Sequence, residues 1–121
     1  MTRINCIPPQ ELTSKHLLAE YRELPRVFGL ARLTPDIPAS YTMGRGHVLF
    51  FYNKLTYLAN RHASLVAEMK HRGFTVNFPS PPQSNHAELY NDWVPTPEAM
   101  AINRHRIAER LNKIPTVANA P

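Results

Sequence analysis

The stretch from Leu17 to Gly29, LLAEYRELPRVFG, constrains the fold more than any other part of the chain. At 3.6 residues per turn its apolar and charged residues separate onto different faces of a helix. The apolar stripe is Leu17, Tyr21, Leu24 and Phe28, and the cationic stripe is Lys15, Arg22 and Arg26 with Glu23 at its edge. The first stripe predicts a helix that packs on a core. The second is typical of a surface that faces a polyanion, and a solvated helix with ordinary charges gives the same pattern.

Prolines indicate where this helix begins and where it kinks or ends. An extended lead-in stops at Pro9, after which Thr13 or Ser14 can cap the helix. Pro25 has no N–H to donate to the preceding turn, so the sequence predicts that the helix kinks or ends near Leu24.

Two more helices are expected. Apolar residues recur at three- and four-residue steps from Val48 to Met69, which predicts one long buried helix closed by Gly73. Thr96-Pro97-Glu98 is a strong start signal for another, which Pro115 should stop. In this last helix the predicted core stripe is Met100, Ile107, Leu111 and Ile114, and the predicted cationic stripe is Arg106, Arg110 and Lys113.

The remaining chain has no helical or strand pattern. Residues 33–40 and 74–95 are rich in proline, and we expect the second segment to pack through Phe78, Tyr90 and Trp93. The sequence therefore predicts an all-α protein, a compact single domain over residues 1–121 in which three main helices are joined by long irregular connections.

Charge and composition narrow the classes of function. Fourteen Lys and Arg against nine Asp and Glu give a net charge of +5 and a pI near 9.7, which favours a polyanionic partner. The single Cys6 excludes an internal disulfide and a Cys-based zinc site, and we expect it to be a small buried residue. We predict no metal and no cofactor, because no metal-binding spacing connects the six histidines: His16, His47, His62, His71, His86 and His105.

No apolar run approaches the roughly 20 residues that span a membrane, and the opening residues MTRINCIPP contain no signal-peptide core. We expect a soluble cytoplasmic protein, associated with the nucleoid if its polyanion is DNA.

The second residue offers a reactive group. An initiator Met is generally removed when a small residue follows it, which would expose the α-amine of Thr2, whereas a retained Met1 would leave that nitrogen in a peptide bond. An α-amine has a reference pKa of roughly 7.7–8.0, against roughly 10.4 for Lys. Like-charge repulsion from the arginines at positions 3, 22 and 26 would lower it further. A neutral amine can attack an electrophilic sugar carbon or an aldehyde.

Five blocks of sequence carry a family resemblance: TRIN at 2–5, HLLAEYRELPRVFG at 16–29, GRGHVLFFYNKL at 44–55, KHRGF at 70–74 and VPTPEAMAI at 94–102. In this order they resemble the pyrimidine-dimer DNA glycosylase/AP lyase family, over roughly Thr2 to Thr116. The resemblance implies a compact helical monomer that slides on duplex DNA, kinks it and flips out a base opposite the lesion.

It also implies a mechanism. The N-terminal threonine amine attacks the anomeric carbon of the damaged nucleotide, an imine joins enzyme and sugar, and β-elimination cuts the strand on the 3′ side. The catalytic residues then correspond to Thr2 and Glu23, and the DNA-contacting cations to Arg3, Arg22, Arg26, Arg106 and Arg110. A carboxylate among cations should stay ionised, and it would stabilise positive charge at the sugar and the iminium.

Some assignments stay open at this stage. His16 and His47 can line the site, but a structural role is favoured for both. Segment 33–40 is shorter and less basic than the family pattern, and the last residues, TVANAP, contain no aromatic. These departures leave an abasic-site lyase with little dimer specificity as an alternative. A non-catalytic DNA-binding helical module is a further alternative, in which Thr2 and Glu23 occur together by accident.

Overall fold

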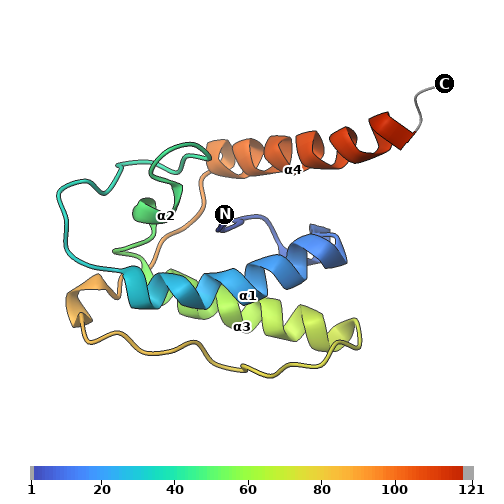
Figure 1. Cartoon of the computed structure of the whole chain (residues 1–121). Helices are drawn as coiled ribbons and strands as arrows, with labels where there is room; N and C mark the ends of the chain where they lie inside the picture. Colours follow the sequence, from blue (N-terminus) through green and yellow to red (C-terminus); the bar gives the residue numbers. More distant parts are fainter. Residues whose placement is uncertain (1, 119–121) are drawn as a thin grey trace.

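The computed structural model describes residues 2–118, and it describes side chains as far as Leu111. Its helices are α1 (Ser14–Leu30), α2 (His47–Phe50), α3 (Leu55–His71) and α4 (Pro97–Ala118), with single 3-10 turns at Pro9–Glu11 and Ala87–Leu89 (Figure 1). Over this part of the chain there is no strand. The all-α prediction with three long helices is confirmed.

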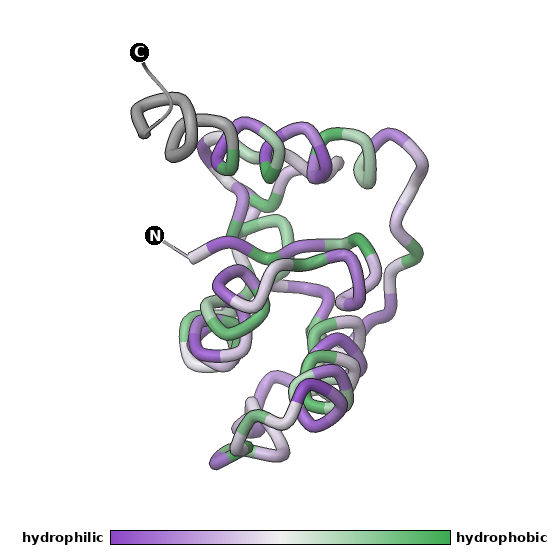
Figure 2. Tube along the Cα trace, turned by 90° about the vertical axis from the view of Figure 1, so that its right-hand side faces the viewer, coloured by the Kyte–Doolittle hydropathy of each residue, from purple (hydrophilic) through white to green (hydrophobic). Residues whose placement is uncertain are grey.

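The helices form two levels with the beginning of the chain between them. α1 and α3 pack against each other, and α4 lies apart from them on the other side of the extended N-terminal segment (Figure 1). A perpendicular view shows the same order of layers (Figure 2). Within the described residues, no helix is long and apolar enough to cross a membrane.

The core follows the predicted stripe of α1. The side chains of Leu17, Tyr21, Leu24 and Phe28 are all at most 7% exposed. An aromatic cluster extends the core, with ring centroids of neighbouring pairs 5.1 to 6.0 Å apart; it consists of Tyr41, Phe50, Phe51, Tyr57 and Trp93.

The predicted caps are present. The hydroxyl of Thr13 accepts the backbone N–H of His16 at 3.2 Å at the start of α1. The hydroxyl of Thr96 accepts the N–H of Ala99 at 3.0 Å at the start of α4. After α3, Gly73 has a φ of +85°, the left-handed conformation that glycine adopts without a steric penalty.

α1 continues through Pro25 to Leu30, so the predicted alternative of a helix end before this proline is wrong. The proline leaves the carbonyl of Tyr21 without its helical N–H donor, and an interior proline costs about 3 kcal/mol. Val27 and Phe28 lie beyond the proline and are at most 4% exposed. Burying such side chains contributes about 1.5–3 kcal/mol each, which offsets the local cost.

The single helix predicted over Val48–Met69 is wrong, because the chain leaves the helical path between α2 and α3. Residues 50–52 are consecutive aromatics and all are at most 6% exposed. Since successive residues of a helix point in different directions, one continuous helix cannot bury all three against one neighbour. The break turns them inward, and the ammonium of Lys54 donates to the carbonyl of Phe50 at 2.9 Å at the end of α2.

The long connection 74–95 packs through only part of the predicted aromatic set. Tyr90 and Trp93 are partly buried against the core, as predicted. Phe78 is 65% exposed, so its predicted packing role is wrong. Its backbone is held instead, because the N–H of Phe78 donates to the hydroxyl of Tyr21 at 2.7 Å.

α4 contributes less to the core than its sequence predicts. Met100 and Ile107 are partly buried, but Leu111 is 39% exposed and lies outside the core. As far as Leu111, where the described side chains end, the buried positions of this helix are Ala99 and Asn103.

The backbone of α4 passes through Pro115 to Ala118, so the predicted helix stop is wrong. The predicted positions Lys113 and Ile114 fall outside the residues whose side chains are described.

Candidate active site

The segment Ile4–Ile7 contributes Asn5 to the floor of the candidate site, and its four residues are at most 6% exposed. No strand pairs with it in the described chain, so its buried backbone groups need other partners. Side chains from distant parts of the chain bond to six of its eight backbone groups. The N–H and carbonyl of Ile4 bond to His47 and Tyr41, the carbonyl of Asn5 to Tyr57, the N–H groups of Cys6 and Ile7 to Asn103, and the carbonyl of Ile7 to Arg61.

A buried ion pair supports this segment from below. Arg61 of α3 meets Glu20 of α1 through two bonds, Nε to Oε2 at 2.8 Å and Nη2 to Oε1 at 3.0 Å. The amide of Asn5 donates to the same Oε1 at 2.8 Å. Burial lowers the pKa of the Arg61 guanidinium and the Glu20 carboxylate raises it, with a net increase that keeps the guanidinium charged.

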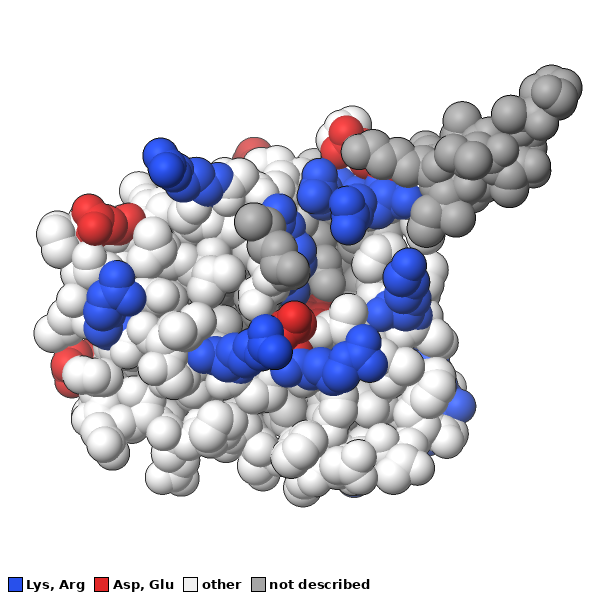
Figure 3. Space-filling view, viewed as in Figure 1, with Lys and Arg blue, Asp and Glu red and all other residues white. Residues whose placement is uncertain are grey.

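Above the segment, between α1 and α4, lies a cavity of about 650 Å³. Figure 3 shows this face of the molecule, where cationic groups gather around a recess that contains acidic atoms. The residues that line the cavity are Arg3, Asn5, Lys15, His16, Ala19, Glu20, Glu23, Met43, Arg106, Ile107, Arg110 and Leu111. Thr2 directly precedes Arg3 and is partly buried, but it is not among the residues that line the cavity.

Three of the five predicted DNA-contacting cations line this cavity, namely Arg3, Arg106 and Arg110. Burial lowers the pKa of the Arg3 guanidinium, and the positive charges of Arg106 and Arg110 lower it further. The cations therefore repel one another, and a bound anion would relieve that repulsion. Arg22 and Arg26 do not line the cavity and lie exposed on α1.

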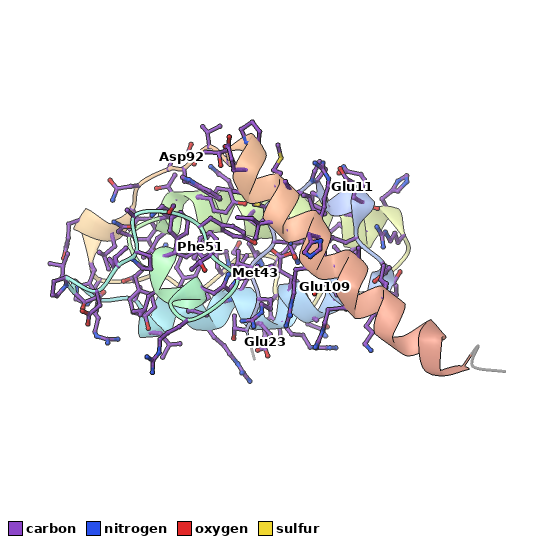
Figure 4. The ribbon with its side chains drawn as sticks, turned by 90° about the horizontal axis from the view of Figure 1, so that it is seen from above. Glu11, Glu23, Met43, Phe51, Asp92 and Glu109 are labelled. Atoms are coloured by element: carbon purple, nitrogen blue, oxygen red, sulfur yellow. The ribbon has the colours of Figure 1, made fainter. Side chains whose placement is uncertain are left out.

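The two carboxylates in the cavity, Glu23 and Glu20, differ in exposure and in their bonding partners. Glu20 is 2% exposed and committed to Arg61 and Asn5. The Glu23 side chain is 26% exposed, and its Oε2 lies 3.0 Å from the guanidinium of Arg26. Viewed from above, Glu23 and Met43 lie beside α4 on one side of the molecule (Figure 4). An accessible carboxylate among cations is suited to stabilising a cationic intermediate next to a bound phosphate.

The two candidate histidines have different surroundings. His47 is 2% exposed, and its Nε2 accepts the N–H of Ile4 at 2.8 Å. Burial lowers its pKa to about 4, with a raising effect from the carbonyl of Thr42 and a lowering effect from Arg3. His47 is therefore a neutral structural residue and is not among those lining the cavity. His16 does line it, and burial, Lys15 and Arg110 lower its pKa.

Sequence reasoning missed several residues that build this site. Met43 lines the cavity, and Asn103 and the Glu20–Arg61 pair hold its floor. Lys15 also lines it and was predicted only as part of the cationic stripe of α1. A usable signal existed for Glu20, because a charged residue beside the apolar stripe of a helix needs a buried partner. Among the described residues, no group of three or more His, Cys, Asp or Glu is placed to hold a metal ion.

A comparison with known protein families gives a match over residues 1–81 of the 121-residue chain. The matched part contains the N-terminal segment, α1 and α3, and it ends before α4. The matching family is described as pyrimidine dimer DNA glycosylase.

Proposed function

The chain belongs to the pyrimidine dimer DNA glycosylase family, and we propose that it excises damaged bases from duplex DNA and then cuts the strand as an AP lyase, with the α-amine of Thr2 as nucleophile. One observation carries the proposal. The extended N-terminal segment brings Arg3, the direct neighbour of Thr2, into the cavity that Glu23 also lines. This arrangement supports the proposal that the amine of Thr2 acts beside the Glu23 carboxylate and the cavity arginines.

The proposed reaction starts with the neutral amine, which attacks C1′ of the damaged nucleotide. The base leaves with the electrons of the glycosidic bond and takes up a proton, while the attacking nitrogen loses one. The sugar ring opens as O4′ takes up a proton, which leaves an iminium between C1′ and the Thr2 nitrogen. Loss of a proton from C2′ and departure of the 3′ phosphate then cut the strand.

Glu23 stabilises the positive charge that develops on the sugar and the nitrogen during this reaction. Its carboxylate stabilises the sugar cation and the iminium electrostatically, and it can transfer the protons that the ring opening and the elimination require. Its exposure of 26% leaves an oxygen accessible to a bound sugar.

The arginines hold the DNA. Arg3, Arg106 and Arg110 surround the cavity and bind the phosphates next to the lesion, while Arg22 and Arg26 extend the cationic surface along α1. Planar guanidinium groups bind phosphate oxygens through two donors at once, which suits a distorted backbone better than the point charge of Lys.

A second candidate function is cleavage of abasic sites with little activity on dimers. Within the part of the chain with described side chains, no Phe, Tyr or Trp lines the cavity. The described site therefore offers no large aromatic surface on which a damaged base could stack. An abasic site needs no such surface, because its sugar already presents an aldehyde.

Borohydride trapping tests these proposals. Purified protein whose first residue is Thr2, verified by mass, should form a covalent adduct with an abasic duplex and with a duplex that contains a cyclobutane dimer. Thr2→Ser keeps a small second residue and a free amine, so it should still form the adduct. Thr2→Leu, which retains Met1, should not. An adduct with the abasic duplex alone supports the second candidate, and no adduct with either duplex refutes the amine mechanism.

A further inference from the structure

We propose that Asn103 of α4 is a positioning residue that fixes the register of the N-terminal segment, so that the amine of Thr2 is held toward the cavity. The proposal rests on the proposed function, because it assigns to Asn103 the placement of that nucleophile. Asn103 itself is fully buried and does not line the cavity.

The hydrogen bonds of Asn103 use both ends of its amide. Oδ1 accepts the N–H of Cys6 at 2.7 Å and the N–H of Ile7 at 3.3 Å. Nδ2 donates to Oδ1 of Asn5 at 2.8 Å. An asparagine amide combines two acceptor lone pairs with donors, so one side chain satisfies three consecutive residues of the segment.

The position of this anchor along the segment decides what it controls. Cys6 lies four residues after Thr2, and the segment between them is extended. A slip of one residue would move the chain by about 3.3 Å and turn each side chain to the opposite face. Such a displacement is as large as the attack distance of about 3–3.5 Å that a nucleophile requires. A loose segment would therefore misplace the amine without unfolding the protein.

The same anchor joins the nucleophile to the DNA-facing part of α4. Asn103, Arg106 and Arg110 are spaced at three and four residues, so they lie along one side of the helix. The two arginines line the cavity, and Asn103 holds its floor. Phosphate binding that fixes α4 through its arginines thereby also fixes the segment that carries the amine.

A second connection leads to the catalytic carboxylate. Asn103 donates to Asn5, and Asn5 donates to Glu20 of α1 at 2.8 Å. Glu20 lies one helical turn before Glu23, and both line the cavity. The chain of bonds from Asn103 through Asn5 to Glu20 therefore sets the N-terminal segment relative to the helix that carries Glu23.

The test compares Asn103→Ala with Tyr21→Phe, a matched control. The Tyr21 hydroxyl also accepts two consecutive backbone N–H groups, those of Asn77 and Phe78, but it lies away from the N-terminal segment. Each protein, with Thr2 as its first residue, is assayed for duplex affinity and for the rate of borohydride trapping on an abasic duplex with the enzyme in saturating excess. Hydrogen exchange at the amides of Cys6 and Ile7 reports the anchor independently of activity.

We expect Asn103→Ala to lower the saturated trapping rate by about tenfold or more while duplex affinity changes much less, since the loss is one of geometry. Tyr21→Phe should trap at close to the wild-type rate despite its own loss of stability. Asn103→Asp keeps the acceptor for both N–H groups but not the donor, so it should trap faster than Asn103→Ala. If Asn103→Ala does not fold, Asn103→Asp must still trap more slowly than the wild type.

Opposite results overturn the proposal in distinguishable ways. A folded Asn103→Ala protein with the wild-type trapping rate, or an equal loss in Tyr21→Phe, excludes a positioning role. Unchanged exchange at Cys6 and Ile7 in Asn103→Ala excludes the anchor itself. The absence of any adduct from the wild-type protein would instead overturn the proposed function.

Discussion

Acid should weaken the hold on the N-terminal segment through His47. In the neutral ring, Nε2 accepts the N–H of Ile4 at 2.8 Å, and Nδ1 lies 2.7 Å from the carbonyl of Thr42, to which it donates. A protonated ring carries a hydrogen on Nε2 as well, which would point at the Ile4 N–H. Two donors cannot bond to each other, so the cation loses the contact. The neighbouring charged group, Arg3, also disfavours the cation, while burial raises the pKa of the adjacent Tyr41 phenol and keeps it neutral.

The size of the effect follows from the two states of this histidine. Its pKa is 6.5 when unfolded and about 4 when folded, chiefly because the folded ring is buried. The unfolded chain therefore binds the proton first as pH falls. The contribution to stability is complete above about pH 6.5 and is lost progressively toward pH 4. At about 1.36 kcal/mol per pH unit the full loss is about 3 kcal/mol, of which about 2 kcal/mol falls between pH 7 and pH 4.5.

Urea unfolding at about pH 7 and about pH 4.5 measures this loss in the wild type, in His47→Gln and in His86→Gln. His86 is a half-exposed histidine and serves as the control. Titrating carboxylates are common to all three proteins and cancel in the comparison. The wild type and His86→Gln should each lose about 2 kcal/mol more than His47→Gln. An equal loss in His47→Gln would refute the assignment of the pH dependence to this ring.

Three further predictions concern charged residues. Glu23→Gln should bind duplex DNA normally but cleave it about a hundredfold more slowly or worse; normal single-turnover cleavage would contradict the assigned role. Arg26→Ala should weaken binding and reduce the slope of log affinity against log salt by the amount expected for about one phosphate contact. Lys70→Ala, at the exposed end of α3, is the control and should leave the slope unchanged. Arg61→Met removes the cation from the buried Glu20 carboxylate. The free energy of unfolding, measured in urea, should fall by about 3–5 kcal/mol. A loss of stability as small as that of a surface ion pair would contradict the prediction that Glu20 depends on Arg61.

Hydrophobic periodicity predicted the helices correctly where the local sequence pattern and the packing of the folded protein favour the same structure. The stripe of α1 lies on one face and packs on one core, so its periodicity identified the buried residues correctly. The break after Phe50 was not predicted, because Val48, Phe51, Tyr52 and Leu55 fit the spacing of a continuous helix when Phe50 is left out. Phe50 and Phe51 pack against Trp93, which lies some forty residues further along. Pro25 shows the reverse case, in which core packing beyond a proline outweighs a strong local stop signal.

The site was less accessible from sequence than the helices. Stripes of charge identified cationic faces, but only the placement of α4 brings Arg106 and Arg110 to the same cavity as Arg3. The same placement leaves Arg26 outside it. The roles given to Thr2 and Glu23 came from the family resemblance and are still proposals. Asn103 was not predicted at all, since a single buried amide has no periodicity and its partners lie near the opposite end of the chain.

The layer formed by the N-terminal segment also sets an order of events during synthesis. Residues 4–7 leave the ribosome well before α4, because the amide that binds the N–H of Cys6 is 97 positions later. At a translation speed of about 5–20 residues per second, residues 4–7 are without that partner for on the order of 5–20 s. During this interval the start of the chain is not yet enclosed, and an aminopeptidase can reach it. The helix that completes the enclosure, α4, also carries Arg106 and Arg110. Under the proposed function, newly made protein therefore gains its DNA contacts and its positioned amine at the same time.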